Sequence, residues 1–186
     1  MKKYMNMWGL ILVIGVFSVS QNSFSQEKKL NRQEKKEARK AAMTANFDTL
    51  NSLLEARSFV LKAYNLENKY GDMVQVSSNT NFILINSTNG ILQTAFNSMG
   101  GNNGLGGVTA EGTVGSWEVV RNQKNLTFTV KFSLVTNIGI YDVFMTVNSD
   151  SRAHAEISGL APGRLIYKGY LSPVSEARVF KGRNSI

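Results

Sequence analysis

The sequence predicts a mainly β protein of the α+β class, in which an antiparallel meander of about eight strands follows one N-terminal helix. Two observations carry this prediction. Good helix formers fill residues 31–57 without a glycine or proline, and polar and apolar residues alternate in most segments after residue 58. The connections between those segments are too short to hold a crossover helix, so consecutive strands should pair as neighbours.

The helix expected over residues 31–57 has two unlike halves. Its second half carries Leu50, Leu53 and Leu54 at helical spacing, with Phe47 ahead of them. Apolar residues that recur in this way form a stripe along one side of a helix. We expect this half to pack on the sheet and the first half to be solvated.

The clearest strand is expected over residues 126–134. Its apolar residues Phe128, Val130 and Phe132 alternate with polar residues such as Lys131. This pattern indicates a strand with one solvent-exposed face. Such a strand favours antiparallel pairing, because parallel sheets are usually covered on both faces. Similar patterns predict strands at residues 59–66, 73–76, 82–86, 91–96, 108–120, 141–147, 152–157 and 165–171.

The turns and glycines favour a small barrel over an open curved sheet or a sandwich. Asn89-Gly90 and Pro162-Gly163 have the chemistry of tight turns, and Gly112 and Gly115 fall inside the longest strand. Glycines within a strand often mark a bulge or bend in a strongly curved sheet. Closure into a barrel would also remove the exposed edges that invite aggregation.

Residues 1–25 have the order of features of a cleavable signal peptide. Lys2 and Lys3 precede an apolar stretch at residues 8–19, and Ser23 and Ser25 provide the small side chains for cleavage before Gln26. A stretch of about a dozen residues is too short to span a bilayer, which takes roughly 20. No membrane segment is expected after processing.

The expected product is a soluble periplasmic or secreted protein. It is not a lipoprotein, since the chain has no cysteine to carry a lipid. Behind the signal peptide we expect a basic segment and helix at residues 26–57, an antiparallel β domain at residues 58–182 and a tail at residues 183–186.

The basic residues are concentrated near the start of the chain. The formal net charge is +8, yet residues 26–40 alone hold seven Lys or Arg against three Glu. The remaining body is nearly neutral and lacks a basic patch interleaved with aromatic residues, so no nucleic-acid partner is expected. The basic segment is either a solvated helix start or a contact to anionic lipid or polysaccharide of the cell envelope.

A glycine-rich stretch between two predicted strands is the most distinctive local motif. It is not a phosphate loop, because Val108 and Thr109 begin a strand where a helix would be required. The stretch is either a plain connection or a flap that contacts a ligand. The ligand-binding candidates are Gly100, Gly101, Asn102, Asn103, Gly104, Gly106 and Gly107.

His154 is the single histidine, which leaves one imidazole for general-base chemistry. Alternation places it on a polar strand face with Arg152 and Glu156. Glu111 and Glu118, seven residues apart on one strand, are expected on opposite faces, unlike the facing carboxylates of a glycosidase. No catalytic residue, metal ligand or cofactor is predicted, and a hydrolase using His154 stays open as an alternative.

Several aromatic residues lie in predicted strands and their connections. They are candidates either for core packing or for the lining of a pocket. The residues concerned are Tyr64, Tyr70, Trp117, Tyr141, Tyr167 and Tyr170.

Three short segments carry a family resemblance. They are Glu-Ala-Arg-Ser-Phe-Val at residues 55–60, Gly-Val-Thr-Ala-Glu-Gly at residues 107–112 and Glu-Ala-Arg-Val-Phe-Lys-Gly at residues 176–182. Together they resemble the exported Bacteroidetes proteins grouped as domain of unknown function family 4251. The resemblance implies a Gram-negative envelope setting and supplies no catalytic or ligand-binding residue.

That setting implies one modification site. Bacteroidetes glycosylate exported proteins on Asp-Ser/Thr-apolar triplets, and Asp48-Thr49-Leu50 fits this pattern. Thr49 is the candidate acceptor, although its predicted helical location counts against it.

The leading hypothesis is an exported, non-enzymatic β protein that binds a small or lipid-like ligand or an envelope partner. The alternatives are a secreted hydrolase that uses His154 and a tether that attaches to the envelope surface through the basic helix.

Overall fold

The computed structural model describes residues 31–95, 107–160 and 163–185. The chain divides into two compact units, residues 1–35 and residues 36–186. The signal peptide expected at residues 1–25 lies outside the described ranges.

Helix α1 (Arg32–Glu55) begins at a capping box. The Asn31 side-chain oxygen accepts hydrogen bonds from the backbone N–H groups of Gln33 and Glu34, both at 2.9 Å. The Glu34 carboxylate accepts a bond of 2.8 Å from the Asn31 N–H. The helix ends before Arg57, whose φ of 49° stops the helical path. The predicted helix is therefore confirmed, with ends set by these two local structures.

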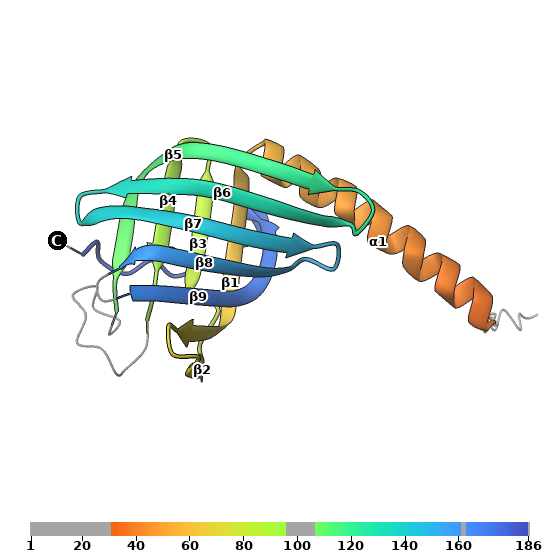
Figure 1. Ribbon diagram of the computed structural model, residues 1–186, viewed down its shortest axis with the longest axis horizontal. Helices are drawn as coiled ribbons and strands as arrows, with labels where there is room; N and C mark the ends of the chain where they lie inside the picture. The colour runs from red at the N-terminus through yellow and green to blue at the C-terminus, as the bar shows by residue number, and fades with distance from the viewer. Residues whose placement is uncertain (1–30, 96–106, 161–162, 186) are drawn as a thin grey trace, which may run out of the picture. The chain divides into compact units, whose positions relative to one another are not determined.

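In the described residues nine antiparallel strands follow α1, and eight of them form a closed barrel (Figure 1). Each strand pairs with the next along the chain, except that β1 pairs with both β2 and β3, and the pairing of β1 with β9 closes the ring. The strands are β1 (Ser58–Asn68), β2 (Met73–Gln75), β3 (Phe82–Asn86), β4 (Asn89–Gln93), β5 (Thr109–Asn122), β6 (Thr127–Thr136), β7 (Gly139–Asn148), β8 (Arg152–Leu160) and β9 (Gly163–Pro173).

The barrel interior is filled by alternate side chains of its strands. On β6 the inward residues Phe128, Val130, Phe132 and Leu134 are at most 3% exposed. Similar rows come from the other strands of the barrel and form one apolar core. The alternation read from the sequence is confirmed, and it places the core within the ring of strands.

A bulge in β5 changes which side chains face outward. Val114 is opposite Leu134, whereas Trp117 is opposite Phe132, so β5 has one extra residue between these pairs. The extra residue reverses the alternation beyond it. Glu111 and Glu118 therefore both lie on the outer face, and the expectation of opposite faces is wrong. Strict alternation holds only in a strand without a bulge.

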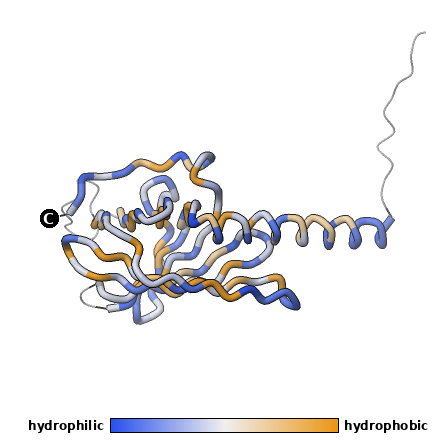
Figure 2. The backbone as a smooth tube through the Cα atoms, turned by 90° about the horizontal axis from the view of Figure 1, so that it is seen from above, coloured by the Kyte–Doolittle hydropathy of each residue, from blue (hydrophilic) through white to orange (hydrophobic). Residues whose placement is uncertain are grey.

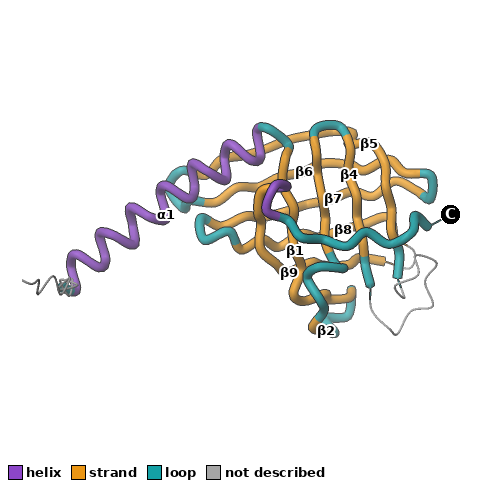
Figure 3. The backbone as a smooth tube through the Cα atoms, turned by 180° about the vertical axis from the view of Figure 1, so that it is seen from behind, coloured by secondary structure: helices purple, strands orange, loops and turns teal. Residues whose placement is uncertain are grey.

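The chain ends as a segment laid across the outside of the barrel, which we call the strap (residues 174–185). It starts with the short helix η1 (Val174–Glu176), which contacts β1 and β3. Figure 3 shows it continuing across the near side of the strands toward β5. The outward residues Val60 and Phe82 are fully buried on this side of the barrel. The strap thus covers part of the outer face of the barrel.

Candidate functional site

The candidate site is the exposed beginning of α1 within the second unit. Residues 36–42 are exposed throughout, and three of them are basic. Lys36 and Lys40 are four residues apart with Arg39 between them, so the three share one side of the helix. We call Lys36, Arg39 and Lys40 the basic face. Figure 2 shows hydrophilic residues in this part of the helix and hydrophobic residues recurring toward its end.

The second half of α1 is anchored by apolar packing. Phe47, Leu50 and Leu54 are at most 1% exposed. The Phe47 ring stacks on Phe128 of β6, with 4.4 Å between ring centroids. This confirms the predicted stripe, although Ala42 and Ala45 ahead of it are exposed. The helix is held at one end and presents the basic face beyond the anchored residues.

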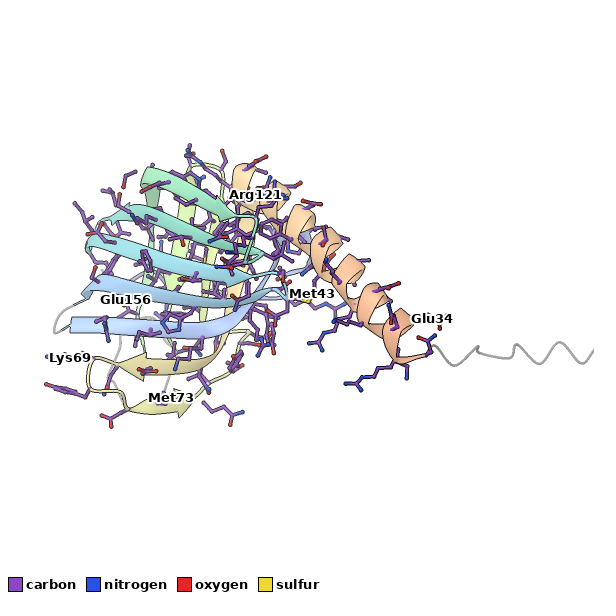
Figure 4. The ribbon with its side chains drawn as sticks, turned by 45° about the vertical axis from the view of Figure 1, so that its right-hand side comes forward. Glu34, Met43, Lys69, Met73, Arg121 and Glu156 are labelled. Carbon is purple, nitrogen blue, oxygen red and sulfur yellow. The ribbon has the colours of Figure 1, made fainter. Side chains whose placement is uncertain are left out.

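Polar contacts fix the same part of α1 against the turns and strands of the barrel. The Asn46 side-chain amide donates to the backbone oxygen of Ser149 at 2.6 Å and to the Ser151 hydroxyl at 3.0 Å. Arg121 of β5 forms an ion pair with Asp48 at 2.8 Å, and its guanidinium lies 4.7 Å from the centroid of the Phe47 ring. Figure 4 shows Arg121 beside the helix. These polar contacts are directional, and they add to the apolar packing that holds this half of α1 on the barrel.

The aromatic candidates do not form one pocket. Tyr141 and Tyr167 are buried in the barrel interior. Tyr64 and Tyr170 pair on the outer face, with ring centroids 5.5 Å apart. The remaining two are also separate: Trp117 contacts Phe59 and Phe132, and Tyr70 is exposed beyond the end of β1.

Tyr167 fills part of the barrel interior. It is fully buried, and burial raises the pKa of its hydroxyl above the usual value. The hydroxyl donates a 2.9 Å hydrogen bond to the backbone oxygen of Gln93 on β4. Because β4 is three strands away from β9 around the ring, this side chain joins two distant parts of the wall. Tyr167 thus helps to fill and brace the barrel.

His154 lies on the exposed outer face of β8. It pairs in register with Thr146 of β7 and Lys168 of β9, and Arg152 and Glu156 share its face as predicted. Within residues 31–95, 107–160 and 163–185 it makes no hydrogen bond to a serine or carboxylate, and no cluster of three metal-ligating side chains occurs. The structure therefore does not assemble a catalytic group around His154 in these ranges.

Most of the predicted flap lies outside the described residues: Gly100, Gly101, Asn102, Asn103, Gly104 and Gly106. Gly107 is described and buried. A side-chain carbon there would lie 2.1 Å from the backbone oxygen of Thr94, which explains the glycine. Thr94 and Val108 are joined by backbone and side-chain hydrogen bonds, and the Asn81 amide holds Ala95. Both ends of the glycine segment are thus fixed to the barrel.

Thr49 is exposed in the anchored half of α1, and its hydroxyl donates to the backbone oxygen of Ala45 at 3.1 Å. The preceding residue of the triplet, Asp48, is held by Arg121.

Sequence reasoning missed the polar groups that hold the strap. Gln93 is fully buried on the outer side of β4, and its side-chain amide donates to the backbone oxygens of Thr80 and Phe180 at 2.9 and 2.8 Å. Its carbonyl oxygen accepts from the Gly182 N–H at 2.7 Å. A lone glutamine at the end of a strand gives no signal of this role, because its partners are far away in the sequence.

A charged contact fixes the far part of the strap. The Glu111 carboxylate accepts hydrogen bonds from the Lys181 ammonium and from the Asn184 amide. These bonds, led by the one from Lys181, lower the pKa of Glu111 below its usual value. A carboxylate with a lowered pKa in the folded state contributes stability above its unfolded pKa, and that stability is lost as the pH falls through the folded pKa.

We therefore expect acid to loosen the strap at its Glu111 end. As the pH falls through the folded pKa of Glu111, protonation should lower the protection of the Ser185 amide against hydrogen exchange, relative to the intrinsic rate at the same pH. The Ser185 N–H donates to the Thr109 backbone oxygen at 2.9 Å. Glu111→Gln should have low protection at neutral pH and should lose this pH dependence. Glu118→Gln is the matched control, since Glu118 lies on the same strand and forms an ion pair with Lys131 at 3.5 Å, away from the strap. Unchanged exchange in Glu111→Gln would contradict the expectation.

The described helix is not long and apolar enough to cross a membrane.

Comparison with known proteins assigns the barrel to a family. The family described as "Domain of unknown function (DUF4251)" matches residues 41–171. A crystal structure of a DUF4251 family protein from Bacteroides eggerthii DSM 20697 is 31% identical, with a TM-score of 0.63, and the match covers 75% of this chain and 95% of that chain. No curated protein matches. The matched residues include the anchored half of α1 and most of the barrel, while the basic face and the strap lie outside them. The matched span and the solved relative show that this chain, a closed barrel with one helix, belongs to the DUF4251 family.

Proposed function

We propose that the chain is an exported, non-enzymatic binding protein of a Bacteroidetes cell envelope, and that the basic face attaches it to an anionic surface there. The signal-peptide pattern at residues 1–25 supports export. The family relative from a Bacteroides species supports the organism class.

The observation that carries the proposal is the exposed basic start of α1. A helix that is polar on all sides gains no stability from packing, yet residues 36–42 extend α1 beyond its anchored half. Positive charge on one side of such a helix is complementary to phosphate or carboxylate groups on a surface. The anchored half supplies a rigid connection from this contact to the barrel.

We expect the basic face to bind its anionic surface electrostatically, without insertion of the helix into a bilayer. Within residues 36–42 only alanines accompany the charged side chains, so the segment lacks the large apolar residues that bury an interfacial helix. Exposed charge pairs are screened by salt, with a Debye length of about 8 Å at physiological ionic strength. Binding should therefore weaken steeply as salt is added.

The two other functions have less support. A small ligand inside the barrel would compete with packed side chains such as Tyr167 and Phe128. A hydrolase would need partners beside His154, which is exposed on the outer face and makes no hydrogen bond in the described part of the chain.

Neutralising the basic face is expected to abolish most surface binding. In the chain begun at Gln26, Lys36→Gln, Arg39→Gln and Lys40→Gln together should weaken binding to vesicles of phosphatidylglycerol and phosphatidylcholine on the order of 100-fold. This follows from about 1 kcal/mol for each basic residue near an anionic surface. Cosedimentation with the vesicles measures the change.

The matched control removes three positive charges elsewhere. Lys69→Gln, Lys131→Gln and Arg164→Gln change the net charge equally but leave α1 intact, so binding should fall by less than about tenfold. A parallel arm with polygalacturonate immobilised on beads distinguishes an acidic polysaccharide from a lipid. If the two triple variants bind both probes equally well, the proposal is wrong.

A further inference from the structure

Two tyrosine rings lie together on the outer face of the barrel where β1 and β9 meet. Tyr64 of β1 and Tyr170 of β9 have ring centroids 5.5 Å apart and an interplanar angle of 44°. Tyr170 is 50% exposed. The pair therefore presents aromatic surface to solvent on a rigid closed sheet.

Basic residues flank this pair in the same row of the sheet. Tyr170 is directly opposite Lys62 on β1 and directly opposite Arg152 on β8, so it lies between two cations on neighbouring strands. Arg152 forms an ion pair with Asp150 at 2.6 Å, while Lys62 has no ion pair within the described ranges. We call Tyr64, Tyr170, Lys62 and Arg152 the tyrosine platform.

The neighbouring row adds a charged pair and the histidine to this face. Lys168 and His154 are opposite each other across β9 and β8. Lys168 bonds Glu67 at 2.6 Å and, more than any other group, lowers the pKa of that carboxyl. Arg164 forms an ion pair with Glu156 at 3.4 Å. An anion that approaches the platform therefore meets Lys62 as a cation that has no ion pair within the described ranges.

We propose that the tyrosine platform binds an acidic sugar unit of an oligosaccharide. The apolar face of the sugar ring would pack on Tyr170, and its carboxylate would accept hydrogen bonds from Lys62 and Arg152. A lipid tail fits less well, because the residues around the rings are charged and form no apolar groove. This site is separate from the basic face and does not depend on it.

The experiment isolates the platform from the helix. It uses the chain begun at Gln26 with the basic face neutralised by Lys36→Gln, Arg39→Gln and Lys40→Gln, titrated with oligogalacturonate by isothermal titration calorimetry. Tyr170→Ala should weaken binding by about tenfold, in keeping with roughly 1 kcal/mol for an aromatic contact. Tyr170→Phe keeps the ring and should bind as the parent does. Arg152→Gln should weaken binding while leaving the rings in place.

The matched control is Phe144→Ala. Phe144 is an aromatic residue on the outer face of β7 and is 46% exposed, close to the exposure of Tyr170. It should leave binding unchanged, and maltohexaose, which is neutral, should bind at least tenfold more weakly than oligogalacturonate. The inference is overturned if the parent does not bind oligogalacturonate, or if Tyr170→Ala and Arg152→Gln bind it as tightly as Phe144→Ala does. A negative result in this titration would not bear on the proposal for the basic face, which the vesicle experiment tests separately.

Discussion

Replacing Gly169 by alanine is expected to prevent the barrel from closing. Gly169 lies on β9 opposite Ala63 of β1 and Ala153 of β8. A side-chain carbon at this position would lie 2.1 Å from the backbone oxygen of Lys62. Backbone atoms of a paired strand cannot move aside as a flexible side chain can. The added methyl group would therefore separate β1 from β9, the two strands whose pairing completes the ring.

The expected cost is about 4 kcal/mol or more, which is exceptional for one substitution and a large share of the roughly 5–15 kcal/mol that stabilises a domain. Urea denaturation followed by circular dichroism measures the change. Ser172→Ala on the same strand is the control, because the Ser172 hydroxyl is buried without a hydrogen-bond partner in the described structure. Its removal should be neutral or stabilising by up to about 1 kcal/mol. Equal stability of the two variants would contradict the close packing at Gly169.

Phe47→Ala is expected to release α1 from the barrel. Phe47 is fully buried and stacks on Phe128, so truncation leaves a cavity at the centre of the helix contact. Loss of a buried phenylalanine costs about 3–5 kcal/mol. The neighbouring ion pair of Arg121 with Asp48 is exposed and cannot replace this packing.

Trp117 reports this change directly. It is the single tryptophan of a chain begun at Gln26, and the guanidinium of Arg57, just beyond the end of α1, lies 5.1 Å from its ring centroid. Urea denaturation followed by tryptophan fluorescence should show the lower midpoint of Phe47→Ala. Thr49→Ala is the matched control on the exposed side of the same helix, with an expected change within about 0.5 kcal/mol. A midpoint for Phe47→Ala equal to that of Thr49→Ala would mean that the helix is not needed for stability.

The sequence was sufficient to predict the helix and each strand, because their periodicities are strong and their turns are local. Alternation through Phe128, Val130 and Phe132 identified the inward face of β6 correctly. The preference for a barrel is also confirmed. Closure was predictable as a physical preference, since a meander of short turns leaves two edges exposed and closure pairs them with each other.

The bulge in β5 was predictable as a feature of the strand but not in its effect on the faces. Gly112 and Gly115 inside the longest strand predicted a bend or bulge, and the bulge lies between Val114 and Trp117. The sequence did not indicate that it adds one residue and so reverses the faces of everything beyond it. The strap has no periodicity of its own, and its hydrogen bonds reach strands some 70 to 90 residues earlier in the chain. Nothing in the local sequence of residues 174–185 indicates those partners.

The candidate sites were predictable only in part. The charge run that contains Lys36, Arg39 and Lys40 was evident from composition, but its exposure follows from how far the apolar stripe extends along α1. The pairing of Tyr64 with Tyr170 could not be foreseen, because these residues come from the first and last strands of the barrel. Their proximity requires the ring to close.

The pairing of β1 with β9 also sets an order on folding. Every other strand of the ring can pair with the strand made just before it, so those contacts form between nearby parts of the chain. The last pairing joins Phe59 with Pro173 and has to wait for nearly the whole chain. Contacts between residues so far apart form slowly, because a long loop must be closed first. A chain still emerging from a ribosome therefore carries two unpaired sheet edges until its last strand appears, and such edges can pair with other chains for that interval.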